Sequence, residues 1–252
     1  MSWQGMPRWH AIRVVGKREL AAYFDSPIAY VFLVIFLLLA GFFTFTFGGF
    51  FERGEASLAS LFSWMPWLFL FLVPAVGMRL WSEERRLGTI ELLLTMPVAT
   101  WQVIFGKFLA SWAFLVIALA LTFPIVITVN WLGDPDNGVI ASGYVGAALL
   151  AGAYLAIACM TSALTRNQVI AFILAVLLCL VLILAGFSPL TDLFARWASP
   201  ALVEFVSKFS VLTHYDGFQK GVLDSRDLLY FLSVMAFSLF ATGVIIRNHR
   251  AG

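Results

Sequence analysis

The sequence contains few charged residues. Only 12% of its 252 residues are Asp, Glu, Lys or Arg, whereas 62% are hydrophobic. Soluble domains typically carry about a quarter charged residues, so this composition excludes an ordinary soluble domain and predicts a protein that crosses a membrane several times. The net charge of +2 is too small to suggest nucleic-acid binding.

Cysteine and histidine are also scarce. The two cysteines, Cys159 and Cys179, lie inside apolar runs, where cysteine packs as a small side chain, so neither a disulfide nor a metal site is expected. The three histidines lie outside the long apolar stretches. Residues 1–26 contain several charges and no long apolar core, which argues against a cleavable signal peptide and predicts that the N-terminus is retained.

Motifs of three functional classes are missing. Gly16-Lys17 and Gly106-Lys107 lack the upstream glycine and the following Ser or Thr of a phosphate-binding loop, so this chain is not expected to hydrolyse ATP by that route. No charged residue or histidine lies near the middle of an apolar stretch, whereas ion-coupled carriers usually keep ionisable groups there. A Glu-Glu-x-x-x-Arg intramembrane protease is disfavoured because Gly88 stands where the arginine should be. We therefore expect no enzyme activity, cofactor or metal in this chain.

Six apolar stretches are each long enough to span a bilayer, which takes about 20 helical residues. They are residues 27–51, 58–80, 108–132, 143–164, 168–190 and 228–246. An even number of spans places both termini on the same side. The sequence therefore predicts an all-α integral membrane protein with one transmembrane domain over residues 1–252.

The basic residues predict the orientation of these spans. If the N-terminus is cytoplasmic, the basic residues on the outer side are only Arg53, Arg196, Lys208, Lys220 and Arg226, out of 16 in all. Cytoplasmic loops carry an excess of Lys and Arg. Both termini are therefore predicted to be cytoplasmic.

The longest charged interruption in the first half is residues 82–97, SEERRLGTIELLLTMP. Ser82 is a candidate helix N-cap, Glu83 and Glu84 fall in the first turn, and Pro97 closes the helix. Burying its five charged side chains in a bilayer would cost roughly 15 kcal/mol, against roughly 2.5 kcal/mol gained from its apolar ones. The predicted helix therefore lies outside the membrane.

The apolar residues of the same segment indicate a docking surface. Leu87, Ile90 and Leu94 share one face at helical spacing. We therefore expect residues 82–97 to form an amphipathic cytoplasmic helix that packs on another surface rather than a solvated loop.

Two further segments are predicted to lie near the membrane surface. Residues 9–25 alternate apolar and basic side chains, which predicts an interfacial helix, with a basic tail as the alternative. The connection 191–227 has an apolar stripe at helical spacing and predicts two short, half-buried helices that either gate a pathway or cap the bundle. The large apolar residues of this predicted hairpin are Phe194, Trp197, Phe205 and Phe209.

Smaller features complete these expectations. The adjacent polar residues 214–216 are interpreted as a solvated turn, and Asp224 or Ser225 as the N-cap of the last span. Small residues also recur four apart on the fourth span, which permits close helix contact, within one subunit or across a dimer. They are Gly143, Ala147 and Ala151, and separately Ala148, Gly152 and Ala156.

Residues 83–97, EERRLGTIELLLTMP, resemble the E-E-x-x-x-G-T-x-E-x-L-L-x-x-P signature of ABC-2 type transporter permeases. The Ser-Pro-Ile at 26–28, the turn at 165–168 and the approach to the last span at 221–228 further resemble the gliding-motility-associated (GldF-type) subgroup. Six spans in this order extend the resemblance over nearly the whole chain.

This resemblance implies a permease of the bacterial inner membrane that pairs with an identical or paralogous permease. Two ABC ATPase subunits, which hold ATP and Mg²⁺, would bind on the cytoplasmic side, and lipids or a periplasmic auxiliary protein are further expected partners. It implies that 82–97 is a coupling helix and 191–227 a periplasmic re-entrant hairpin. The implied ATPase-coupling residues are Glu83, Glu84, Arg85, Gly88, Thr89, Glu91 and Pro97.

The function expected from this resemblance is ATP-driven export or periplasmic mechanical work, with ATP hydrolysed by the separate subunit. The alternative is a membrane scaffold that docks an ATPase to act on periplasmic partners without moving a solute. The sequence does not identify a cargo.

Overall fold

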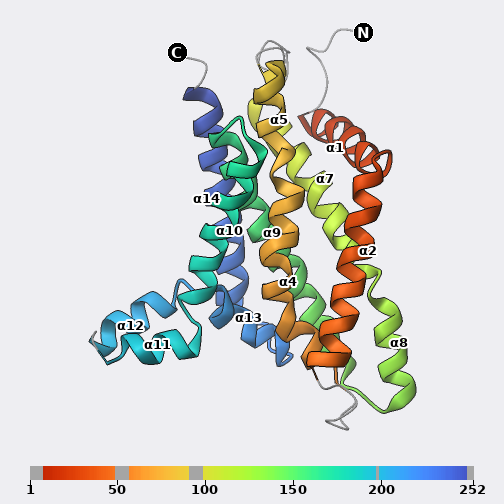
Figure 1. Ribbon diagram of the computed structural model, residues 1–252, viewed down its shortest axis with the longest axis vertical. Coiled ribbons are helices and arrows are strands. Elements are labelled where there is room, and N and C mark those ends of the chain that lie inside the picture. Colours follow the sequence, from red (N-terminus) through yellow and green to blue (C-terminus); the bar gives the residue numbers. More distant parts are fainter. Residues whose placement is uncertain (1–7, 49–56, 91–98, 197–198, 249–252) are drawn as a thin grey trace.

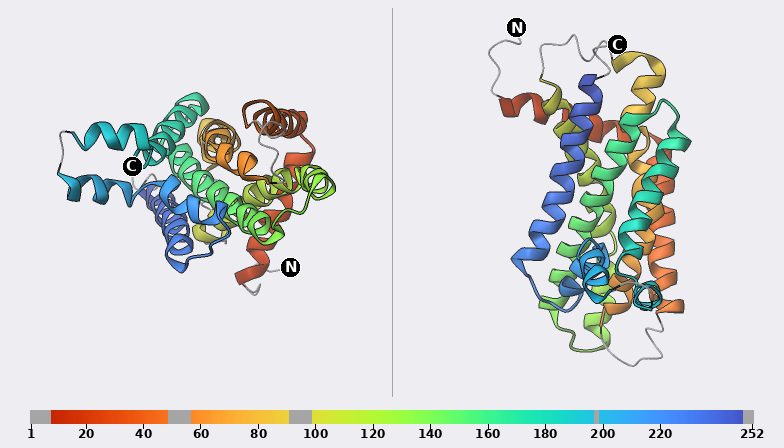
Figure 2. Two further views of the ribbon diagram at one scale, coloured as in Figure 1. Left: turned by 90° about the horizontal axis from the view of Figure 1, so that it is seen from below. Right: turned by 90° about the vertical axis from the view of Figure 1, so that its left-hand side faces the viewer.

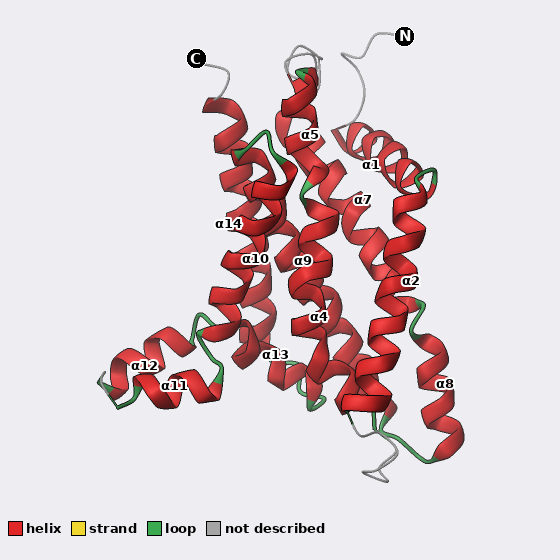
Figure 3. Ribbon diagram, viewed as in Figure 1, coloured by secondary structure: helices red, strands yellow, loops and turns green. Residues whose placement is uncertain are grey.

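The protein is built from helices. Figure 1 shows the computed structural model, which describes residues 8–48, 57–90, 99–196 and 199–248. Within these ranges there are helices and loops but no strands (Figure 3). The predicted all-α class is therefore found throughout the described part of the chain.

The helices begin where the local sequence supplies caps. Ser26 accepts a hydrogen bond from the backbone N–H of Ile28 (3.3 Å) and precedes a proline that suits the first helical turn. Asp136 and Asn167 cap the later helices α9 and α10 in the same way. In chain order the described elements are α1 (Arg8–Phe24), α2 (Pro27–Phe42), the π-helical turn η2 (Phe43–Phe47), α4 (Ala59–Gly77), α5 (Arg79–Leu87), α7 (Thr100–Ala120), α8 (Phe123–Leu132), α9 (Asn137–Leu164), α10 (Gln168–Leu184), α11 (Ser188–Phe194), α12 (Pro200–Ser207), α13 (Val211–Gln219) and α14 (Ser225–Asn248).

Five helical runs are long and apolar enough to cross a membrane, and each overlaps one predicted span. They are Pro27–Phe47, Ala59–Leu87, Thr100–Leu132, Asn137–Leu164 and Ser225–Asn248. Helices α10 and α11 together make a sixth candidate, although the chain bends by 70° between them. The chain is therefore a multi-pass membrane protein.

Several helix bounds differ from the predicted ones. Helix α7 already begins at Thr100 rather than near residue 108, and it breaks before α8, where Pro124 has no N–H for a helical hydrogen bond. Helix α10 ends at Leu184 instead of continuing to residue 190. Hydropathy alone marks where a segment is apolar, not where its helix stops.

Helix α9 forms the centre of the bundle. Its most apolar window is 83% buried, compared with 28% for the first candidate span and 33% for α14. Glycines on α9 let neighbouring helices approach closely. If a Cβ were added to Gly143, it would lie 2.4 Å from the Phe62 ring of α4, and one added to Gly152 would lie 2.9 Å from Met235 of α14. These small residues of α9 therefore make close contacts inside this chain.

The two ends of the bundle differ in shape. Helix α1 lies across one end, where α5 and the end of α14 also lie (Figure 1). The opposite end carries α13 and the pair α11–α12, which projects sideways from the bundle (Figure 2). We call these two regions the α5 end and the hairpin end.

Candidate functional site

The charged segment after α4 forms a shorter helix than predicted. Helix α5 runs from Arg79 to Leu87 and continues α4 almost without interruption. Ser82 is not an N-cap, because it is buried within α5 and its hydroxyl donates to the carbonyl of Met78. Glu91 and Pro97 lie outside the described residues.

Gly88 ends α5 rather than lying inside a longer helix. Its φ of +71° places it in the left-handed region, which glycine adopts without steric cost. The hydroxyl of Thr89 then donates to the carbonyl of Glu84 at 3.3 Å and satisfies one of the free carbonyls of the last turn. The predicted continuous helix is therefore interrupted by a turn at Gly88.

The start of α5 is attached to the end of α9. The hydroxyl of Ser162 donates to the carbonyl of Met78 at 2.8 Å and accepts from the backbone N–H groups of Trp81 and Ser82, both at 3.0 Å. The indole N–H of Trp81 also contacts the sulfur of Cys159 at 3.1 Å. These contacts fix α5 against α9 by both backbone and side chain.

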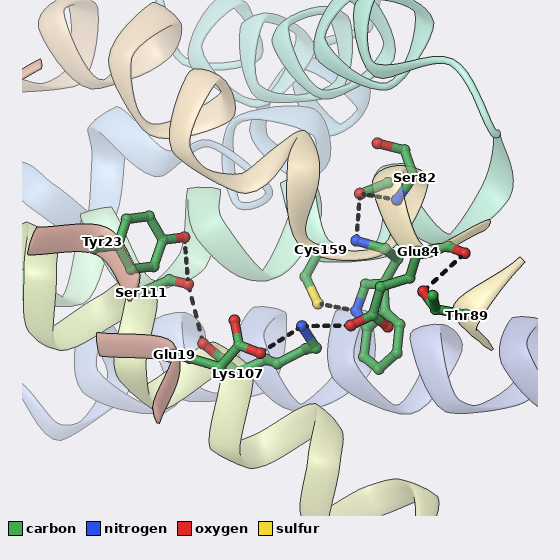
Figure 4. Close-up of polar contacts among 10 residues, drawn as sticks. Glu19, Tyr23, Ser82, Glu84, Thr89, Lys107, Ser111 and Cys159 are labelled. Atoms are coloured by element: carbon green, nitrogen blue, oxygen red, sulfur yellow. Dashed lines mark hydrogen bonds and ion pairs between the residues drawn. The ribbon is translucent and has the colours of Figure 1, made fainter. Parts of the chain in front are cut away.

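A buried ion cluster joins α5 to two more helices. Nζ of Lys107 on α7 lies 2.9 Å from Oε1 of Glu19 on α1 and 2.8 Å from Oε1 of Glu84 on α5 (Figure 4). The lysine side chain is only 6% exposed. It also lies 5.7 Å from the centre of the Trp81 ring, within reach of a cation–π interaction. One cation therefore connects α1, α5 and α7.

The cluster carries more negative than positive charge. Two carboxylates share one ammonium group, and Oε2 of Glu84 is buried without a hydrogen-bond partner among the described residues. Arg79 and Glu83 line the adjoining cleft of about 300 Å³. Loss of the Lys107 charge would therefore leave two neighbouring carboxylates without their cation.

A second polar contact holds α1 on α7. The hydroxyl of Ser111 donates to the carbonyl of Lys107 at 3.0 Å, so the Tyr23 hydroxyl donates to Ser111 at 2.9 Å. The Tyr23 ring stacks on Phe114 with 5.0 Å between ring centres. Burial raises the pKa of the Tyr23 phenol, and the hydrogen bond to Ser111 opposes part of that shift.

The predicted coupling residues thus fall into two groups. Glu84 faces the ion cluster, and the Arg85 guanidinium donates to the carbonyl of Ala163 at the end of α9. In contrast, the residues from Arg86 to Thr89, which we call the α5 tip, are exposed, with Leu87 64% exposed. One face of α5 anchors it to the bundle and its end is free for contact.

The predicted hairpin residues lie at the other end of the molecule. Phe194, Phe205 and Phe209 are 57%, 60% and 54% exposed, so the short helices are not half-buried in this chain. Trp197 lies outside the described residues. The connection also contains three helices, α11 to α13, rather than two. The structure therefore does not bring the hairpin residues near the coupling residues.

The polar residues 214–216 were wrongly interpreted as a solvated turn. They belong to α13, where Tyr215 is fully buried and Nδ1 of His214 lies 2.7 Å from Oδ1 of Asp227. The N-cap prediction for the last span is confirmed, because Asp224 accepts from the backbone N–H of Arg226 at 2.9 Å.

Sequence reasoning did not single out Glu19 or Lys107. They are 88 residues apart, and from the sequence Lys107 is placed in an incomplete phosphate loop and on the cytoplasmic side without an assigned partner. A lysine directly before a long apolar run, here residues 108–132, is the signal that could have indicated a buried partner.

The family described as ABC-2 family transporter protein matches residues 51–215, which is more than half of the chain. This match contains α5, Lys107 and the hairpin, whereas Glu19 precedes it. No curated protein matches the chain.

Proposed function

This chain belongs to the ABC-2 family of transporter proteins, and we propose that it is the permease subunit of a transporter driven by a separate ATPase. Membership of the family makes it a transmembrane subunit of an ABC transporter. The observation that carries the proposal is the arrangement of α5, whose base is held by Lys107 and whose tip is exposed.

Helix α5 is suited to transmit a displacement into the membrane. It continues α4, so Ala59–Leu87 is one helical run from the α5 tip into the bundle. The Lys107 cluster and the contacts to Ser162 connect its base to α1, α7 and α9. A movement of the ATPase against the tip would therefore reach four other helices.

The proposed complex contains two permease chains, identical or paralogous, and two ATPase subunits. The α5 end would be cytoplasmic, in agreement with the basic residues Arg13, Lys17, Arg79 and Arg86 in its helices α1 and α5. ATP hydrolysis would then drive export of a substrate or mechanical work on the far side.

A matched pair of substitutions tests the docking surface. Leu87 and Leu223 are 64% and 65% exposed and lie at opposite ends. Leu87→Asp should reduce co-purification with the co-expressed ATPase by about tenfold or more, because a carboxylate would replace an apolar contact at an interface. Leu223→Asp should leave it unchanged. Equal ATPase association of both variants would refute the proposed role of the α5 tip.

Topology is tested separately by cysteine labelling in intact cells. The native Cys159 and Cys179 are buried and should not react. A membrane-impermeant reagent should label Asp134→Cys but not Arg86→Cys, both at exposed positions. Labelling of Arg86→Cys alone would reverse the proposed orientation.

Reconstitution in liposomes then distinguishes export from a scaffold that hydrolyses ATP without moving solute.

A further inference from the structure

The hairpin of α11 and α12 is joined to the bundle by few contacts. None of the described residues in α11 or α12 is buried. The groove between α10 and the hairpin, about 430 Å³, is lined almost entirely by apolar side chains. The position of the hairpin therefore depends strongly on the segment that connects α12 to α13.

Three side chains hold this connecting segment through its backbone carbonyls. Two come from α13 and one comes from α14. The donor and acceptor residues are Thr213 with Ser207 (3.1 Å), His214 with Lys208 (3.0 Å) and Tyr230 with Phe209 (2.6 Å). The end of α12 is thereby attached to both following helices.

His214 is the centre of this attachment. Its Nε2 faces the Lys208 carbonyl at 3.0 Å, and its Nδ1 lies 2.7 Å from Oδ1 of Asp227 at the start of α14. Its ring stacks on Tyr230 with 4.0 Å between ring centres. The side chains of His214 and Asp227 are 18% and 17% exposed, so both groups are within reach of protons from the solvent.

Both ring nitrogens of His214 face groups that accept hydrogen bonds. A carbonyl and an ionised carboxylate have no proton to donate, and a neutral imidazole has only one N–H. The imidazolium form is the one that donates to both partners. After loss of a proton, one nitrogen lone pair would point at an acceptor, and that contact would have to open.

We propose that His214 is a proton-controlled latch that fastens the end of α12 to α14. In the closed latch, the imidazolium donates to Asp227 and to the Lys208 carbonyl. Lys208 is the C-cap of α12, and a positive charge favours the carbonyl end of a helix. Deprotonation opens the contact to the Lys208 carbonyl and leaves only the bonds from Thr213 and Tyr230, which loosens the hairpin relative to the bundle.

The charged side chains around His214 come from the hairpin end itself. Helices α4, α9 and α10, which pack against α13, contain no Asp, Glu, Lys, Arg or His. Their titratable residues are Tyr144, Tyr154, Cys159 and Cys179. Among the described residues of the hairpin end, the other charged groups are Glu204 with Lys208, Asp216 with Lys220, and Asp134, Asp136, Asp192, Arg196, Asp224 and Arg226. Histidine is the side chain in this set that ordinarily changes charge between pH 5 and 8.

The protonation state can be measured directly on the full chain in lipid nanodiscs. In the variant His10→Gln/His249→Gln, His214 is the remaining histidine. Nitrogen-15 NMR of the imidazole should show both ring nitrogens protonated at pH 5.5 and only one at pH 8. An unchanged protonation state across this range would overturn the proposal.

Movement of the hairpin needs a second readout. Spin labels at Ala201→Cys on α12 and Arg226→Cys on α14, both exposed, report the distance across the latch. The distance distribution should be narrow at pH 5.5 and lose its narrow component at pH 8. Labelled chains are diluted with unlabelled ones, so that distances between subunits do not contribute.

Two variants separate the latch from a general effect of pH. His214→Gln has no group that gains or loses a proton in this range. Its spin-label distance distribution should therefore be broad at both pH values. Asp216→Asn removes an exposed charge one helical turn from Lys220 but touches neither latch partner, and it should respond as the unsubstituted chain does. A pH response that survives in His214→Gln, or is absent from the unsubstituted chain, would refute the latch.

Discussion

The α5 end and the hairpin end each attach a short helix through a basic side chain, but the two side chains differ. At the α5 end, Lys107 is 6% exposed and lies between two carboxylates. At the hairpin end, His214 is 18% exposed and lies between one carboxylate and one carbonyl. Lysine keeps its charge far above neutral pH, whereas histidine does not.

The two attachments therefore respond differently to pH. A buried lysine with two anionic partners gives a connection that is independent of pH in the physiological range, which suits a helix that must transmit force. A half-buried histidine gives a connection that opens when the imidazolium loses one proton. The Lys107–carboxylate and His214–Asp227 distances are similar, yet the first attachment is permanent and the second is reversible.

The largest effect is expected from Lys107→Met. It keeps the length of the side chain but leaves Glu19 and Glu84 close together without their cation. Removal of one partner from a buried ion pair costs about 3–5 kcal/mol. We expect a lower melting temperature in detergent and loss of ATPase coupling.

A compensating variant sharpens this test. Adding Glu19→Gln and Glu84→Gln to Lys107→Met removes the uncompensated negative charge and should recover much of the lost stability. A stability in Lys107→Met equal to that of the unsubstituted chain would show that the α5 end is not held electrostatically.

The next largest effect is expected from Gly77→Ala, where α4 meets α9 directly below α5. A Cβ at this position would lie 2.4 Å from Cβ of Ala158, so the two helices would have to separate. Overpacking of this kind costs about 1–3 kcal/mol. The measurement is the melting temperature of the purified chain.

Gly41→Ala is the matched control for Gly77→Ala. Both positions are helical, but a Cβ on Gly41 has no atom within 4 Å, so the substitution should be neutral or stabilising. Because alanine favours a helix more than glycine does, equal destabilisation by both would show that the close approach of Gly77 to Ala158 does not control the effect.

Gly88→Ala should have a smaller effect that is confined to the α5 tip. An L-residue in the left-handed region costs roughly 1–2 kcal/mol, and this cost falls on a turn that is exposed. We expect weaker ATPase association with an almost unchanged melting temperature. Gly88→Asn should retain more association, since asparagine tolerates this conformation better. Identical association of all three chains would remove Gly88 from the docking surface.

The main features of the fold could be predicted because they follow from local sequence. Long apolar runs and the sparse charges between them indicate the helices, and the cap at Asp224 was identified from residue type alone. The end of α5 at Gly88 was also encoded locally, since glycine is the usual helix terminator, but the neighbouring leucines favoured a longer helix.

The two charged attachments could not be predicted in this way. The partners of Lys107 come from α1 and α5, and Glu19 is 88 residues away along the chain. His214 and Asp227 are closer in sequence, but they meet only because α13 packs beside α14. Partners on different helices are determined by packing, which a single sequence does not reveal.

The smallest effects are expected from a matched pair, Tyr23→Phe at the α5 end and Tyr230→Phe at the hairpin end. Each removes one hydrogen bond, to Ser111 and to the Phe209 carbonyl respectively, worth about 0.5–1.5 kcal/mol. Burial raises the pKa of Tyr23, so its neutral form stabilises the fold fully below about pH 10, and this contribution is lost as the pH rises further. Melting temperatures between pH 9 and 11 should therefore fall less steeply in Tyr23→Phe than in the unsubstituted chain.

Tyr230→Phe should instead broaden the hairpin distance at pH 5.5 while the response to pH remains, because His214 and Asp227 are intact. If Tyr23→Phe altered the hairpin distance as strongly as Tyr230→Phe, the two ends would not be independent.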